Sequence, residues 1–174
     1  MKKIILLLSL FAIFCLSAED VTNDSIQKGI ITASEMSFEW IIIGDQLEGV
    51  LKGKTSGWIA VGFNPTTKMK DANYIIGFVD GDNVIIEDHF GHSPIGHKAD
   101  TSYRGGKGTA DVTLISGIEK DGWTEIRFRI PLNSKDSFDT VLAKGTHKVI
   151  LAHGPKKNLT SKHKFVTKGE MVIR

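Results

Sequence analysis

The sequence predicts an all-β protein folded as an antiparallel β-sandwich, and three observations lead to this prediction. Apolar and polar residues alternate in short runs such as Met36–Ile42, the period of a strand with one buried face. Asp-Gly pairs, which favour tight hairpins, follow apolar runs at 80–81 and 121–122. No segment of ten or more residues has a helical period. Many short strands joined by tight turns are typical of a sandwich.

The predicted strands, in order, are 30–32, 36–42, 47–51, 58–63, 74–79, 83–90, 110–120, 123–130, 147–153 and 169–173. Trp58–Phe63 is continuously apolar, which indicates a strand buried on both faces. Residues 91–108 are rich in Gly, Ser and Pro and are predicted to be a long functional or mobile loop. The connection 133–144 is predicted to include a short turn of helix at 139–143. No repeat or linker appears, so residues 19–174 are predicted to be one domain.

The first 18 residues have the three parts of a secretory signal peptide. A basic start at Met1–Lys3 precedes the apolar run Ile4–Leu16, and Ser17 and Ala18 supply small residues at the cut. The apolar run is shorter than the ~20 residues of a membrane-spanning helix. The chain is therefore predicted to be secreted, or periplasmic in a bacterium, with no membrane span after cleavage.

Cys15, the one cysteine, lies inside this segment. A lipoprotein signal is the competing interpretation, but Phe14 opposes it because a small residue normally precedes a lipidated cysteine. Cleavage after Ala18 leaves no cysteine for a disulfide or a nucleophile. It also removes Lys2 and Lys3, which leaves 20 of the 22 basic residues, a number equal to that of the acidic residues. This balance, without a clustered basic surface, does not indicate nucleic-acid binding.

The stretch Gly57–Asp80 contains two apolar strands that flank a polar loop with Met69. A loop thioether either folds over the edge of the core or acts as a soft ligand, for example to haem iron. The run GWIAVGFN, the Met loop and DANYIIGFVDG resemble the core motif of DOMON domains, with Asp71-Ala72-Asn73 where that family usually has Ala-Asp. The resemblance covers about residues 36–169 and implies an immunoglobulin-like β-sandwich of DOMON type. That family includes haem-binding cytochromes, sugar binders and haem-free regulatory domains.

The resemblance also implies a second ligand. In the haem-binding members this ligand is a histidine about ten residues after the last long core strand, before an aromatic residue and a glycine. His163, followed by Phe165 and Gly169, fits that description. The resemblance thus implies a haem b domain with Met69 and His163 as axial ligands, which requires both loops to lie at the same end of the sandwich. No C-x-x-C-H motif is present, so the haem would be held non-covalently.

With both axial positions filled, the iron would serve electron transfer and would not be an enzyme's substrate site. Candidate walls of the haem slot are apolar or aromatic side chains: Phe63, Tyr74, Ile76, Phe90, Tyr103 and Phe165. Motifs of hydrolases and nucleotide-binding enzymes are absent, and Glu87 and Asp88 are adjacent in a strand and face opposite ways. Some family members carry a membrane cytochrome or a catalytic domain on the same chain. Because residues 19–174 are predicted to be the DOMON-like domain alone, we expect a redox partner protein or membrane cytochrome on a separate chain.

Two alternatives stay open. His89, His92 and His97 have the spacing H-x2-H-x4-H, which suits copper or zinc, and one of them could ligate haem in place of His163. The other alternative is a haem-free module that binds a sugar, another small ligand or a partner protein. The aromatic rings available for stacking in such a module are Trp58, Trp123 and Tyr103.

Overall fold

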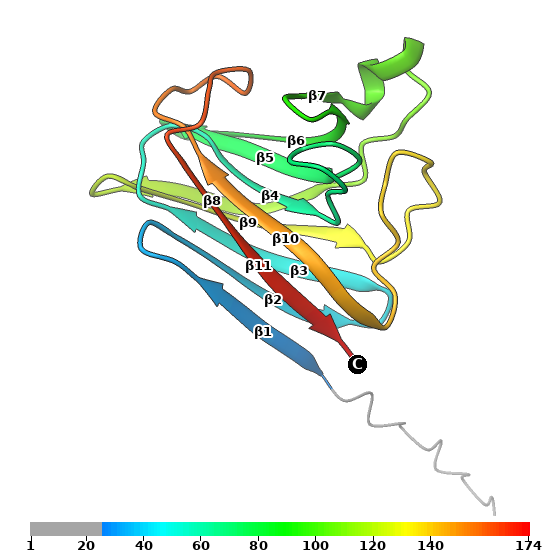
Figure 1. Ribbon diagram of the computed structural model, residues 1–174. Coiled ribbons are helices and arrows are strands. Elements are labelled where there is room, and N and C mark those ends of the chain that lie inside the picture. Colours follow the sequence, from blue (N-terminus) through cyan, green and yellow to red (C-terminus); the bar gives the residue numbers. More distant parts are fainter. Residues whose placement is uncertain (1–25) are drawn as a thin grey trace, which may run out of the picture.

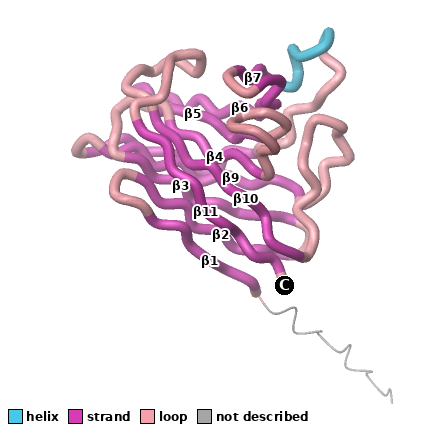
Figure 2. The backbone as a smooth tube through the Cα atoms, viewed as in Figure 1, coloured by secondary structure: helices cyan, strands magenta, loops and turns pink. Residues whose placement is uncertain are grey.

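The computed structural model describes residues 26–174, which form two antiparallel sheets packed face to face (Figures 1 and 2). One sheet has the order β1-β2-β3-β9-β8, and the other has the order β11-β10-β4-β5-β6-β7. The predicted all-β sandwich is therefore confirmed. The predicted signal peptide, residues 1–18, lies outside the described residues. Within residues 26–174 no helix is long and apolar enough to cross a membrane.

The elements are β1 Gln27–Thr32, β2 Met36–Ile43, β3 Gln46–Gly53, β4 Ile59–Phe63, β5 Asn73–Asp80, β6 Asn83–Ser93, β7 Gly96–Ala99, the 3-10 helix η1 Asp100–Gly105, β8 Thr113–Lys120, β9 Trp123–Pro131, β10 Gly145–His153 and β11 Phe165–Ile173. The hairpin between β8 and β9 turns through Asp121 and Gly122, with φ of +53° and +75°. Two positive φ values in a two-residue loop are those of a type I′ turn, as the Asp-Gly pair predicts.

The main core lies between the two sheets, where alternate side chains of each strand point inward. Phe38 and Phe128 are fully buried and stack with ring centroids 6.3 Å apart, and Phe63 meets Phe38 edge-on. Burying each such aromatic side chain contributes about 1.5–3 kcal/mol to folding. The core therefore depends on the period-two pattern that the sequence displays.

Two predicted details of the loops are wrong. Residues 91–108 are not one irregular loop, because β6 continues to Ser93 and turns back as β7, which η1 follows. The predicted helical turn at 139–143 does not form. Instead the Leu142 N–H donates to the Leu132 carbonyl oxygen and the Leu142 side chain is buried, so the chain runs extended toward the core. Both differences arise from backbone pairing that the side-chain pattern does not reveal, between β6 and β7 in the first case and between Leu132 and Leu142 in the second.

Candidate functional site

The six-stranded sheet has a second apolar surface on the face turned away from the other sheet. We call this surface the outer floor and define it by five neighbouring residues: Ala60, Gly62, Tyr74, Ile76 and Ala152. The register pairs Ala60 with both Ile76 and Ala152, and Gly62 with Tyr74, so their side chains share one face. All five residues are buried. Three of these positions carry small residues, and the Tyr74 ring lies over one of them, Gly62.

The loop between β4 and β5, which carries Met69, folds over one end of the outer floor. A Cβ placed on Gly91 would lie 1.9 Å from the Met69 carbonyl oxygen, so the loop can approach β6 there only because residue 91 has no side chain. The Met69 N–H donates to the Pro94 carbonyl oxygen at 3.4 Å. Met69 itself is half-buried. The loop is thus fixed against β6 and the β6–β7 turn.

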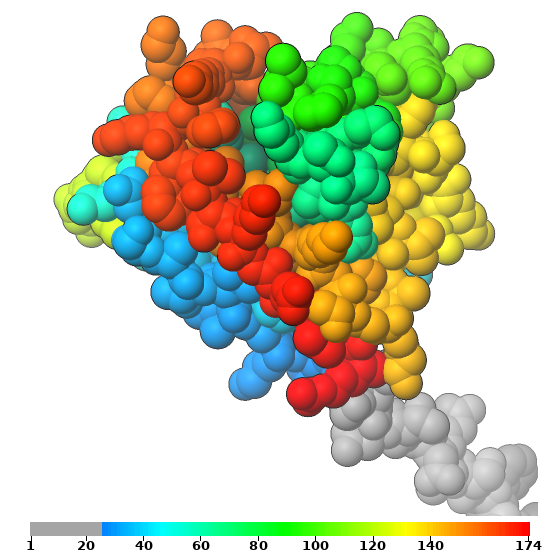
Figure 3. Space-filling model, in the orientation of Figure 1, coloured from blue at the N-terminus to red at the C-terminus, as the bar shows by residue number. Residues whose placement is uncertain are grey.

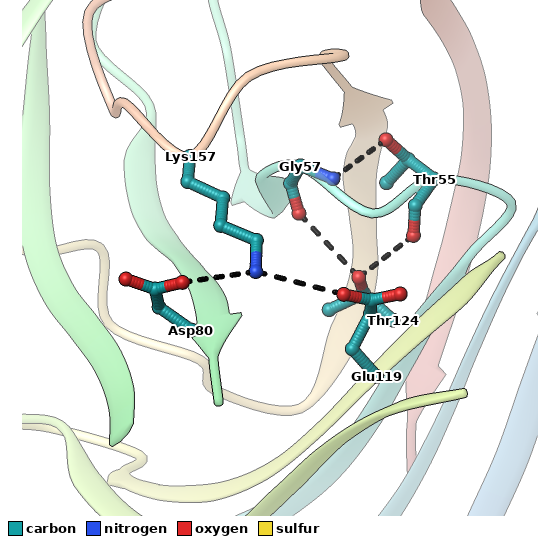
Figure 4. A network of polar contacts seen from close by, with 6 residues as sticks. All are labelled: Thr55, Gly57, Asp80, Glu119, Thr124 and Lys157. Atoms are coloured by element: carbon teal, nitrogen blue, oxygen red, sulfur yellow. Dashed lines mark hydrogen bonds and ion pairs between the residues drawn. The ribbon is translucent and has the colours of Figure 1, made fainter. Parts of the chain in front are cut away.

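The loop between β10 and β11, which carries His163, folds over the other end of the same face. The Trp58 indole N–H lies 2.9 Å from the Ser161 hydroxyl oxygen and 3.2 Å from the Ser161 carbonyl oxygen. Lys157, in the same loop, pairs with Asp80 at 3.0 Å and with Glu119 at 3.6 Å, as Figure 4 shows. These contacts hold the loop near Trp58, and the His163 side chain is exposed.

Hydrogen bonds to Thr55 stabilise the end of the sheet from which the β10–β11 loop leaves (Figure 4). The Thr55 hydroxyl donates to the Gly154 carbonyl oxygen at 2.8 Å and accepts from the Gly57 N–H at 2.9 Å. The buried Thr124 hydroxyl donates to the Thr55 carbonyl oxygen at 2.7 Å. The start of the β10–β11 loop is therefore tied to β9 in the opposite sheet.

The expectation that Met69 and His163 lie at the same end of the sandwich is wrong. β10 runs antiparallel to β4, with Val149 opposite Phe63 and His153 opposite Ile59. The loop that follows β4 therefore leaves one end of the sheet, and the loop that follows β10 leaves the other (Figure 1). What the two loops share is the face, because both fold over the outer floor. In Figure 3 the orange-red residues of the β10–β11 loop and the green residues of β5–β7 lie on either side of a hollow.

Of the predicted haem walls, Tyr74 and Ile76 belong to the outer floor, whereas three others do not. Phe63 is a core residue, 1% exposed, between the two sheets. Phe165 pairs with His153 and stacks on its buried ring at 5.5 Å, also on the inner side. Phe90 alternates with His89 and packs on the rings of residues 103 and 138. Strand alternation points these three side chains away from the outer floor.

Tyr74 supplies a polar atom that fits a ligand on the outer floor. Its side chain covers Gly62, and its hydroxyl is buried without a hydrogen-bond partner within the described chain. Burial raises the pKa of Tyr74 above its ordinary value of 10. A buried hydroxyl left unpaired costs about 1–3 kcal/mol, so this atom indicates a place where a bound molecule would contribute an acceptor.

The histidine cluster forms a relay and not a three-ligand metal site. His89 Nε2 lies 2.7 Å from a Glu87 carboxylate oxygen, and His89 Nδ1 lies 2.7 Å from His97 Nδ1. Since a carboxylate can only accept, His89 donates through Nε2 and its Nδ1 accepts from the His97 Nδ1–H. In residues 26–174 the groups of three close metal-ligating side chains consist of aspartates alone. His92 is exposed and stacks on Tyr103 at 5.7 Å.

Burial favours the neutral form of both inner histidines of this relay. It lowers the pKa of His97 to about 4, with further lowering from the charges of His89 and His92. Burial also lowers the pKa of His89, against the opposing effect of Glu87. In this arrangement His97 Nε2 keeps a lone pair, and the His97 ring lies 6.0 Å from the Tyr74 ring. His97 is thus the member of the cluster that could reach a ligand on the outer floor.

The three rings proposed as a sugar-stacking platform do not share a surface. Trp58 is 4% exposed beneath the β10–β11 loop. Trp123 lies in β9 of the five-stranded sheet, under the Lys52 ammonium at 5.7 Å, and Tyr103 lies in η1.

Sequence analysis assigned no function to a group of buried aspartates. Along β6 the inward positions are Val84, Ile86, Asp88 and Phe90, so an aspartate occupies a core position. That break in the apolar pattern was the one local signal. Asp100 and Asp139, which meet Asp88 in space, come from separate segments and share no motif with it.

Comparison with known proteins matches residues 32–154 to the DOMON domain family. Among solved structures, the cytochrome b domain of pyranose dehydrogenase from Coprinopsis cinerea is similar, with a TM-score of 0.60 and 17% identity over 79% of this chain and 76% of that chain. The cytochrome domain of Myriococcum thermophilum cellobiose dehydrogenase has a TM-score of 0.58 and 12% identity, over 86% of this chain and 83% of that chain. No curated protein sequence matches. At these identities the two structures establish a shared fold.

Proposed function

Since this chain belongs to the DOMON domain family, we propose that it is a haem b-binding electron-transfer domain with Met69 and His163 as the axial ligands. The observation that carries the proposal is the outer floor: an apolar surface with one candidate ligand loop folded over each end. The orphaned Tyr74 hydroxyl supports a bound molecule at this place. The similarity to two cytochrome domains supports haem as that molecule.

In this proposal each part of the site has a distinct task. Ala60 and Ala152 would offer small apolar side chains to the group, while Tyr74, whose ring covers Gly62, and Ile76 would flank it. The Met69 thioether would approach from the β4 end and the His163 imidazole from the β10 end. Haem bound there would supply a one-electron couple, and a thioether ligand favours the ferrous state. With both axial positions filled, the chain carries electrons and does not itself transform a substrate.

The proposal includes a location and a partner. The predicted signal peptide, residues 1–18, would direct the chain out of the cytoplasm. The neighbouring structures are cytochrome domains of dehydrogenases, which supports a redox protein or membrane cytochrome as the electron donor or acceptor of this chain.

Haem titration of the purified mature chain tests the proposal. Haemin added to protein freed of pigment should give a saturable Soret band at one haem per chain and sharp α and β bands after dithionite reduction. Met69→Leu should convert the spectrum toward high spin, and His163→Ala should weaken binding at least tenfold. His92→Ala is the matched control, because His92 is an exposed loop histidine on the same molecule, and it should behave as wild type.

Two results would decide against parts of this proposal. If His163→Ala binds haem normally while His97→Gln loses the low-spin spectrum, the second ligand is His97, whose Nε2 keeps its lone pair. If the wild-type protein gives no saturable spectrum, the haem proposal fails and a haem-free binding module remains. Melting-temperature screens with sugars and metal salts would then identify its ligand, because binding to the folded state raises the melting temperature.

A further inference from the structure

Three aspartate side chains converge inside the sandwich, on the inner side of the sheet that carries the outer floor. Asp88 comes from β6, Asp100 begins η1, and Asp139 lies in the loop between β9 and β10. Each offers one carboxylate oxygen, and these oxygens all lie within 4.8 Å of one another. Asp88 is 3% exposed and Asp100 is fully buried. Three carboxylates in such a small buried volume repel one another strongly.

The oxygens at the centre of this group have no hydrogen-bond donors. Asp88 Oδ1 and both oxygens of Asp100 lack a partner in the part of the chain that the structure describes, and so does Asn73 Oδ1. The Phe90 backbone N–H lowers the pKa of Asp100, but burial and the neighbouring aspartates outweigh this effect. The Asn73 amide nitrogen donates to Asp139 Oδ1 at 2.6 Å, which places the Asn73 amide, with its unpartnered buried oxygen, beside this group.

Two neighbouring aspartates, Asp111 and Asp136, differ from the inner group because both accept hydrogen bonds from Thr109. Asp136 Oδ2 accepts hydrogen bonds from the Thr109 backbone N–H at 2.6 Å and from the Thr109 hydroxyl at 3.1 Å. Asp111 Oδ2 accepts from the same hydroxyl at 2.6 Å. Hydrogen bonds from the loop therefore satisfy Asp111 and Asp136. The inner three aspartates accept fewer: Asp88 Oδ2 accepts from the Asp111 N–H at 3.2 Å and Asp139 Oδ1 from the Asn73 amide, while Asp88 Oδ1 and both Asp100 oxygens have no donor in the described residues.

Nothing in residues 26–174 neutralises the inner group. None of the ion pairs there involves Asp88, Asp100 or Asp139. Without a cation, burial followed by repulsion from neighbouring aspartates raises the pKa of Asp88 to about 9 and that of Asp100 to about 7. Burial likewise raises the pKa of Asp139 to about 6.

We infer that Asp88, Asp100 and Asp139, with the Asn73 amide oxygen, bind one Ca²⁺ ion. The donors are all oxygens, which calcium prefers, and calcium accepts six to eight of them with flexible geometry. Magnesium keeps several waters and is rarely enclosed by protein carboxylates. Zinc favours nitrogen and sulfur donors, which this group lacks.

The ion would join the paired strands β5 and β6 to two segments outside the sheet ladder. It would tie the middle of β6 and Asn73, the first residue of β5, to the start of η1 and the β9–β10 loop. Asn73 follows Met69 by four positions, so the ion would also fix the base of the Met69 loop. The inference does not depend on haem, because the ligands are on the inner side of the sheet.

Thermal unfolding of the mature chain, first dialysed against EDTA, tests the inference. CaCl2 at 100 times its Kd should raise the melting temperature by about 5–10 °C. Asp100→Asn should melt in EDTA at or above the wild-type temperature, because it removes repulsion. In CaCl2 it should gain only about 1 °C, as expected for a 100-fold loss of affinity. Asp82→Asn removes the same charge from an exposed turn and should respond to CaCl2 as wild type does.

Relative to wild type, Asp100→Asn should melt at the same or a higher temperature in EDTA and at a lower temperature in CaCl2. A purely structural carboxylate would give the same difference in melting temperature in both buffers. Equal melting temperatures of the wild type in EDTA and in CaCl2 would overturn the inference. An undiminished calcium response in Asp100→Asn would do the same. A rise in MgCl2 as large as that in CaCl2 would overturn the assignment to calcium. Isothermal titration of the EDTA-treated protein with CaCl2 should give a stoichiometry of one.

Discussion

Acidification should destabilise this protein through the buried His89–His97 pair. Burial lowers the pKa of His97 from its ordinary value of 6.5 to about 4, so between these pH values the unfolded chain binds more protons than the folded chain. The free energy of unfolding that depends on a neutral His97 is fully present above pH 6.5 and is lost as the pH falls toward 4. The full shift corresponds to about 3.4 kcal/mol at 1.36 kcal/mol per pKa unit. Halved for partial solvent exposure, about 1.7 kcal/mol remains.

The assay is the melting temperature of wild type and His97→Gln at intervals from pH 4 to 7.5. At 2–4 °C per kcal/mol for a chain of this size, the wild type should lose roughly 3–7 °C more than the variant on acidification. Buried aspartates contribute with the opposite sign, because their raised pKa values make the folded state bind more protons, but the difference between the two proteins cancels that term. A difference in melting temperature that stays constant across this range would refute the reasoning.

Three further substitutions test the packing that positions the site. Phe128→Ala, at a fully buried ring, should lower the free energy of unfolding by about 3–5 kcal/mol in urea titration, whereas the exposed neighbour Arg127→Ala should change it by less than about 0.5 kcal/mol. Trp58→Phe removes the indole hydrogen bond to the β10–β11 loop and should speed tryptic cleavage of that loop, an effect that Trp123→Phe should not produce. Gly91→Ala should lower the melting temperature and increase protease sensitivity of the β4–β5 loop, because its Cβ would collide with a carbonyl oxygen of that loop; unchanged melting would contradict the tight approach.

The strands could be predicted from the sequence because their signals are local. Alternation along Trp123–Ile130 and the Asp121-Gly122 turn each depend on residues a few positions apart, and both appear in the structure. The β6–β7 hairpin could not be predicted, because β7 has little apolar pattern and is defined by pairing with β6. The inner aspartates also escaped prediction, since Asp88 and Asp139 are 51 positions apart and meet only after β5, β6 and the β9–β10 loop have packed.

The relation between the two proposed haem ligands shows where sequence reasoning failed. Met69 and His163 are each in a loop, as predicted, but the end of the sheet from which each loop leaves depends on which strand β10 joins. β10 pairs with β4 and runs antiparallel to it, so the loops after these two strands must leave opposite ends. Had β10 joined the antiparallel sheet beside β5 instead, it would run in the direction of β4, and both loops would leave one end. Such a pairing between residues 59–63 and 149–153 is non-local, and no residue type specifies it. A site on the outer floor therefore needs its two ligands to approach along the face from both ends, and the lengths of the two loops, with Gly91 under one and Trp58 under the other, decide whether they meet.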